Sequence, residues 1–162
     1  FPYTNALPIS PLESPLHRDG ERLEDNWYFL YVVLEELYLY RFLYCNLDDL
    51  LRRYPKLVRG FRRIVGHKRA ALTAIIHDVL SESGVTLTKV QQEVLIENMT
   101  LQLTYWLSYD RLLHDGRDPQ VSIHKGVLQL LTMVAPYLGE DQLDFYHQCE
   151  VIYEGMLSRD EE

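Results

Sequence analysis

The spacing of apolar residues constrains the fold of this chain most, because from about residue 21 they recur every three or four positions. That spacing matches the turn of an α-helix and differs from the two-residue alternation of a half-buried strand. Four of the seven prolines lie within the first 19 residues, so the rest of the chain contains few helix breakers. The sequence therefore predicts an all-α fold.

The length of 162 residues fits one compact domain around a single core. Residues 1–19 hold four prolines and are predicted to be an irregular linker or tail, since repeated proline prevents a regular helix. Residues 20–162 are predicted to form one helical domain.

The first predicted helix starts near Glu21, and Asn46 is well suited to cap a short second helix over residues 47–53. Pro55 is expected at the first position of a long third helix that ends at Gly84. On the first helix, one face carries Leu30, Leu34, Leu37 and Arg41.

The fourth predicted helix, from Lys89 to His114, opens with a capping box formed by Thr88 and Gln91. Apolar residues lie nearly all round it, which predicts cover on more than one side. A fifth helix follows Asp118 and runs from Pro119 to Val134, and a sixth begins near Glu140.

Three segments of the sequence resemble one protein family. They are residues 40–55, the run Thr104-Tyr105-Trp106-Leu107-Ser108-Tyr109, and the run Ala135-Pro136-Tyr137-Leu138. Their order and spacing resemble the regulatory domain of TetR-type bacterial transcription repressors, from roughly Glu21 to Leu138. The resemblance implies a helical bundle of five to six helices that binds a small-molecule effector and forms a homodimer.

Dimers in that family form through the last two helices of the regulatory domain, so the resemblance points to residues 89–114 and 119–134 as the dimer helices. The predicted interface residues are Leu103, Leu107, Ile123, Val127, Leu130, Leu131 and Val134.

Operator DNA is bound in this family by an N-terminal helix-turn-helix domain, which residues 1–19 cannot supply because their prolines exclude a recognition helix. The net charge of −8 also argues against binding of the DNA phosphate backbone by this chain alone. The sequence therefore predicts operator binding only through an N-terminal domain that is not present here.

Two groups of residues are candidates for binding an effector. Arg41, on an apolar helix face, is either a cation for an acidic ligand or a structural tie to a carboxylate such as Asp48 or Asp49, or to helix C-terminal carbonyls. The second group lies at helical spacing between apolar stripes, where it lines either a ligand cavity or a dimer seam. Its members are Asn98, Gln102, Tyr105, Trp106 and Tyr109.

A basic run between residues 52 and 69 holds half of all Lys and Arg in the chain. It is either a nucleic-acid patch or, as is commoner, the solvated face of an amphipathic helix. The run comprises Arg52, Arg53, Lys56, Arg59, Arg62, Arg63, Lys68 and Arg69.

Enzyme and metal functions find no support in the sequence. The histidines lack metal-ligand spacing, and no phosphate loop or nucleophile elbow is present, so neither a catalytic residue nor a metal or other cofactor is predicted. Cys45 and Cys149 lie in separate helical patterns, which is typical of a reducing compartment, and no apolar run is long enough to span a membrane. A cytoplasmic location is expected.

The sequence thus predicts the effector-binding, dimerising domain of a TetR-family regulator, with repression released by an apolar or amphipathic small molecule. The alternative is a stand-alone helical adaptor that binds another protein through the same apolar helices.

Overall fold

The computed structural model describes residues 23–160, which form seven α-helices and one short 3-10 helix and contain no strand. This confirms the predicted all-α fold. The prediction for residues 1–19 lies outside the described residues. In chain order the elements are α2 (Leu23–Leu39), α3 (Arg41–Tyr44), α4 (Leu47–Arg53), α5 (Leu57–Ser83), α6 (Lys89–Leu113), α7 (Pro119–Val134), η2 (Ala135–Tyr137) and α8 (Glu140–Asp160).

Several helix ends follow the signals in the sequence. At the start of α6, the Gln91 amide donates to Thr88 Oγ1 over 3.2 Å, and the Thr88 amide donates to Gln91 Oε1 over 2.8 Å. Asp118 caps α7 by accepting from the Gln120 amide. Gly84 ends α5 at φ 66°, a left-handed conformation that glycine adopts without strain.

The segment before α5 differs from the prediction in three ways. The first helix ends at Leu39, and a turn at Tyr40 starts the separate helix α3. Asn46 stands at the start of α4, but its side-chain amide donates to the Phe42 carbonyl and does not cap the helix. Pro55 lies in a turn, and α5 begins two residues later.

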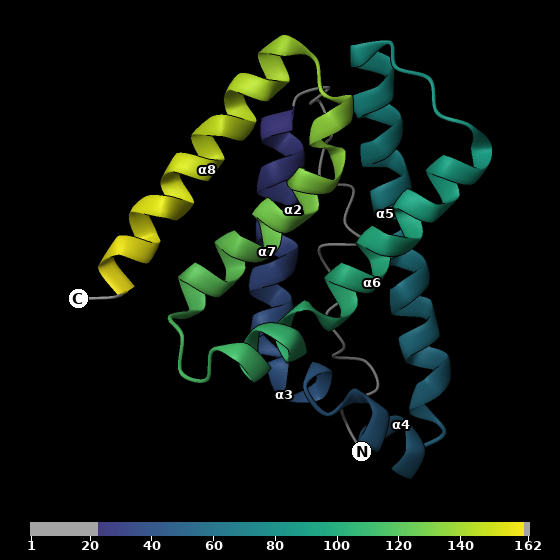
Figure 1. Cartoon of the computed structure of the whole chain (residues 1–162). Helices are drawn as coiled ribbons and strands as arrows, with labels where there is room; N and C mark the ends of the chain where they lie inside the picture. Colours follow the sequence, from purple (N-terminus) through teal and green to yellow (C-terminus); the bar gives the residue numbers. More distant parts are fainter. Residues whose placement is uncertain (1–22, 161–162) are drawn as a thin grey trace.

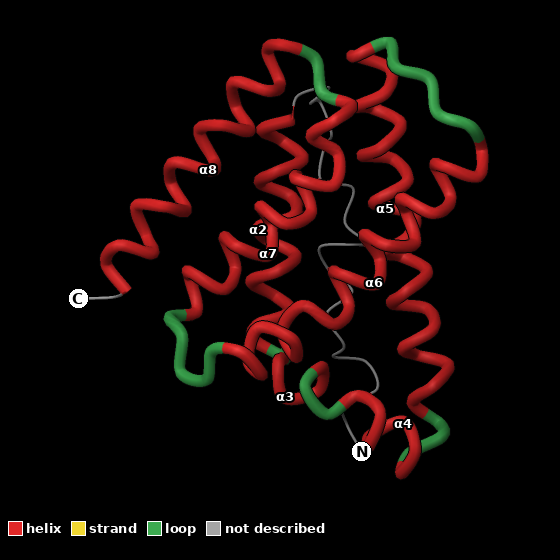
Figure 2. The backbone as a smooth tube through the Cα atoms, in the orientation of Figure 1, coloured by secondary structure: helices red, strands yellow, loops and turns green. Residues whose placement is uncertain are grey.

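The helices form a bundle in which α6 and α7 cross in front of α2 and α5 in the view of Figure 1. Helix α5 packs against α6, α2 packs against α7, and α6 and α7 contact each other. Helix α8 lies along α7 at the edge of the bundle (Figure 2), and short loops join the helices.

The core lies between these four central helices. It includes Leu30 and Leu34 from the predicted stripe of the first helix and Ile64, Leu72 and Ile75 from α5, all of them fully buried. Gly126 permits a close approach of α7 to its neighbours, because a Cβ there would lie 2.7 Å from Trp106 Nε1 and 2.9 Å from Leu34 Cδ1.

Candidate functional site

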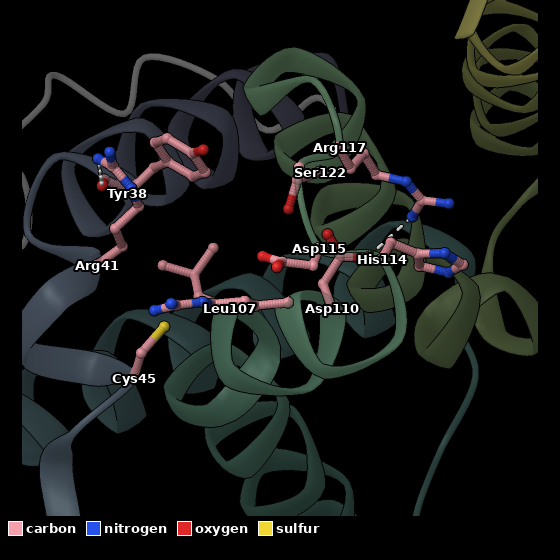
Figure 3. Close-up of a pocket in the computed structure, with 11 residues that line it drawn as sticks. Tyr38, Arg41, Cys45, Leu107, Asp110, His114, Asp115, Arg117 and Ser122 are labelled. Atoms are coloured by element: carbon pink, nitrogen blue, oxygen red, sulfur yellow. Dashed lines mark hydrogen bonds and ion pairs between the residues drawn. The ribbon is translucent and has the colours of Figure 1, made fainter. Parts of the chain in front are cut away.

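A cavity of about 340 Å³ lies where the end of α2 and the short α3 meet the end of α6, the following loop and the start of α7. We call it the corner cavity (Figure 3). It is lined by Tyr38, Arg41, Cys45, Leu107, Asp110, Arg111, His114, Asp115, Gly116, Arg117 and Ser122.

Five of the eleven residues that line the corner cavity are charged, namely three arginines and two aspartates. Arg117 donates to Asp110 Oδ1 over 2.9 Å, and both side chains are nearly buried, at 10% and 5% exposed. This pair fixes the loop after α6. In Figure 3 the carboxylate of Asp115 and the hydroxyl of Ser122 point into the space between that loop and Arg41. The cavity therefore offers groups of both charges to a polar ligand.

Arg41 is exposed, which corrects the prediction that it lies on a buried apolar face. The reason is the turn at Tyr40, which takes Arg41 out of the first helix and off its inner stripe. The guanidinium donates to the Tyr38 carbonyl over 3.2 Å and lies 4.7 Å from the centre of the Tyr38 ring. Asp49 is paired with Arg52 and Arg53 instead.

The other candidate ligand residues line a shallow groove of about 450 Å³ between α6 and α7, apart from the corner cavity and Arg41. The groove residues are Leu95, Asn98, Leu101, Gln102, Tyr105, Trp106, Tyr109 and Met133. Trp106 contributes little surface, because it is 3% exposed and its indole N–H donates to the Ser122 carbonyl.

A row of apolar side chains runs along this outer face of α6 and is open to solvent in the single chain. We call it the outer stripe, and its members are Val94 (52% exposed), Leu101 (58%), Tyr105 (41%), Tyr109 (57%) and Leu112 (81%). Contiguous exposed apolar surface of this kind commonly marks an interaction site. Asn98 lies within the same row and is also exposed.

The residues predicted for the dimer interface all lie in the core of the single chain. Their exposed fractions do not exceed 6%, so a partner chain cannot contact them without unpacking the bundle. Their helices α6 and α7 face each other and the helices behind them, and those contacts bury these seven side chains. The residues corrected in this way are Leu103, Leu107, Ile123, Val127, Leu130, Leu131 and Val134.

One member of the basic run behaves unlike the others. Seven of the eight side chains are exposed, as the solvated-face interpretation expects, but Lys68 is 0% exposed. Its position was readable from the sequence, because Lys68 falls four residues after Ile64 and four before Leu72 on the buried stripe of α5. Burial lowers the pKa of Lys68 to about 7.

Neither metal ligands nor a membrane-spanning helix was found in the part of the chain that the structure describes. No three His, Cys, Asp or Glu side chains there are grouped so that they could hold a metal ion. No described helix has the length and apolar content needed to cross a membrane.

Comparison with known proteins gave two matches. A family model described as TetR, bacterial transcriptional repressor, matches residues 10–146. The fold is similar to the crystal structure of a TetR-family transcriptional regulator from Marinobacter aquaeolei VT8, with a TM-score of 0.71 and 24% sequence identity. That similarity covers 96% of this chain and 72% of the other. The search of curated proteins gave no match.

Proposed function

Because the chain belongs to the TetR family of bacterial transcriptional repressors, we propose that it is the effector-binding and dimerising domain of a transcriptional regulator. The observation that carries this proposal is the outer stripe of α6, an apolar surface that the single chain leaves exposed. A sensor domain that must couple two DNA-binding heads needs such a surface to join its copies.

The homodimer forms, in this proposal, through the outer stripe and not through the core residues of α6 and α7. The stripe residues repeat at helical spacing along one face, so two copies of α6 can pack against each other along their length. Asn98, Gln102, Tyr105 and Tyr109 then face the seam between the chains, where the polar groups form hydrogen bonds across it.

The effector binds in the corner cavity, with Arg41 at its wall as the contact for a polar group. Two observations support this location. The cavity joins three separate segments of the chain, and the Asp115 carboxylate and the Ser122 hydroxyl point into it (Figure 3). An apolar or amphipathic small molecule bound there would contact α3, α6 and α7 together.

Regulation follows from differential binding to two arrangements of the dimer. Operator DNA is bound by an N-terminal domain outside this sequence, and repression is released when the effector favours the arrangement that misplaces the two DNA-binding heads. A ligand can shift that equilibrium only by the difference between its affinities for the two states.

Native mass spectrometry and thermal unfolding test the proposal together. We expect a dimer at micromolar concentration, and a rise in melting temperature with the dose of a bound small molecule, since such a ligand stabilises the folded state. A strictly monomeric chain that no small molecule stabilises, but that captures one defined protein partner, would favour the adaptor function instead.

A further inference from the structure

Lys68 is the most unusual residue of the core. It lies in the middle of α5 between Ile64 and Leu72, and all three side chains are 0% exposed. Lysine is almost never fully buried unless its amino group is paired, because removing a charge from water is costly. Within residues 23–158, however, no carboxylate forms an ion pair with Lys68.

The amino group of Lys68 has too few acceptors. It donates one hydrogen bond, to the Leu103 carbonyl of α6 over 3.3 Å, and it lies 4.5 Å from the centre of the Tyr44 ring. An ammonium group carries three N–H donors, and the attraction of an aromatic face replaces a hydrogen bond only in part. Two donors of the charged form are therefore left without an acceptor atom among the described residues.

Tyr44 adds a second unsatisfied donor beside the first. Its side chain is 2% exposed and packs edge-on against Phe61, and its hydroxyl has no hydrogen-bond partner in the described structure. Because Lys68 Nζ lies over the ring of Tyr44, the hydroxyl is on the rim of the same ring. The core thus holds two neighbouring donor groups and lacks a matching acceptor.

Two residues that line the corner cavity are neighbours of this pair of donors in the chain or in its contacts. Cys45 directly follows Tyr44, and Leu107 lies one helical turn along α6 from Leu103, whose carbonyl accepts from Lys68. Ser108 also joins these elements, since its hydroxyl donates to the Tyr44 carbonyl over 3.0 Å. To reach the two donors from this cavity, a ligand would have to displace side chains that line it, such as Cys45 and Leu107.

We propose that Lys68 and Tyr44 form an interior anion site that selects effectors with a carboxylate head and an apolar body. A carboxylate has only acceptor atoms, so one group would accept from both the ammonium and the hydroxyl. The apolar body of the ligand would take the place of the displaced lining side chains, and its own apolar surface would then be buried. This inference rests on the proposed sensor function and names the chemical class of its effector.

Thermal unfolding of the whole chain with matched pairs of probes tests this site. The probes are naphthoate with naphthylmethanol, and octanoate with octanol, because each pair differs mainly in the anionic head. We expect at least one carboxylate to raise the melting temperature with dose and its neutral partner to act at least tenfold more weakly.

Two substitutions then locate the effect. Lys68→Met keeps the length of the side chain and is expected to weaken carboxylate binding by more than about tenfold, whereas Tyr44→Phe removes only the hydroxyl and is expected to weaken it by about tenfold. Lys56→Met, at an exposed lysine before α5, removes the same charge and should leave binding unchanged.

The outcomes separate this inference from the function on which it rests. The anion site is overturned if neither carboxylate stabilises the chain, if each neutral partner acts equally, or if Lys68→Met binds as the unchanged chain does. Stabilisation of a dimer by the neutral probes alone would overturn the anion site and leave the sensor function standing.

Discussion

The buried amino group of Lys68 makes the stability of this chain depend on pH. Its pKa falls from 10.5 to about 7 on folding, because burial disfavours the charged form. Below pH 7 both states hold the proton. Between pH 7 and 10.5 the unfolded state holds it and the folded state does not, so the free energy of unfolding rises with pH.

We expect Lys68 to make the free energy of unfolding rise with pH above pH 7, with a slope that approaches about 1.4 kcal/mol per pH unit as the folded state loses the proton. This rise should be absent in Lys68→Met. Urea unfolding of both chains at pH 7 and pH 8.5 measures the difference. The pH range stops at 8.5 because burial raises the pKa of Cys149 to about 11 and also raises the pKa of Tyr44. At higher pH these two groups lower the free energy of unfolding as the pH rises, which is opposite to the effect of Lys68. Equal slopes in the two chains would contradict the prediction.

Helix packing depends on Gly126, which leaves no room for a side chain between α7 and the side chains of Trp106 and Leu34. A Cβ at this position would lie 2.7 Å from Trp106 Nε1, and the indole cannot withdraw freely because it is buried and bonded to the Ser122 carbonyl. Gly126→Ala is expected to lower the free energy of unfolding by ~1–3 kcal/mol, despite the better helix propensity of alanine.

Gly66→Ala provides the matched control, because Gly66 also lies inside a helix but has no atom within 4 Å of the added carbon. It is expected to stabilise the chain by about 0.5–1 kcal/mol. Melting temperatures that moved in the same direction for both variants would show that the close approach at Gly126 has no energetic effect.

The pair of Asp110 and Arg117 joins the end of α6 to the loop before α7. Since both side chains are nearly buried, Asp110→Ala leaves an uncompensated guanidinium and is expected to cost about 3 kcal/mol. Asp49→Ala is the control, because the Asp49 pairs with Arg52 and Arg53 are exposed and contribute little. Chemical unfolding of both variants compares the two losses.

The whole molecule is expected to be a dimer joined along the outer stripe of α6. The double substitution of Leu101 and Tyr105 by glutamate places like charges at the seam, which should raise the dimer dissociation constant by at least about 100-fold. Sedimentation at several concentrations measures the constant. Val65→Glu, at an exposed apolar residue on α5, should not change it, and a dimer that survives the double substitution would place the interface elsewhere.

Several helix ends of this chain were predictable from the sequence. The capping box at Thr88, the Asp118-Pro119 start and the glycine stop at Gly84 act through neighbouring residues, so their signals are complete within a few positions. The family that the three short segments resemble is also the one whose model matches residues 10–146.

The partners of each helix face were decided only by the tertiary structure. The sequence shows that α6 is apolar nearly all round, but only the packing of α5 and α7 against it assigns Leu103 and Leu107 to the core and leaves Leu101 and Tyr105 exposed. Likewise, the turn at Tyr40 takes Arg41 out to solvent, and the bundle closes over Lys68. Caps and helical periods are local properties of the chain, whereas burial depends on contacts between segments far apart in it, which the sequence alone does not specify.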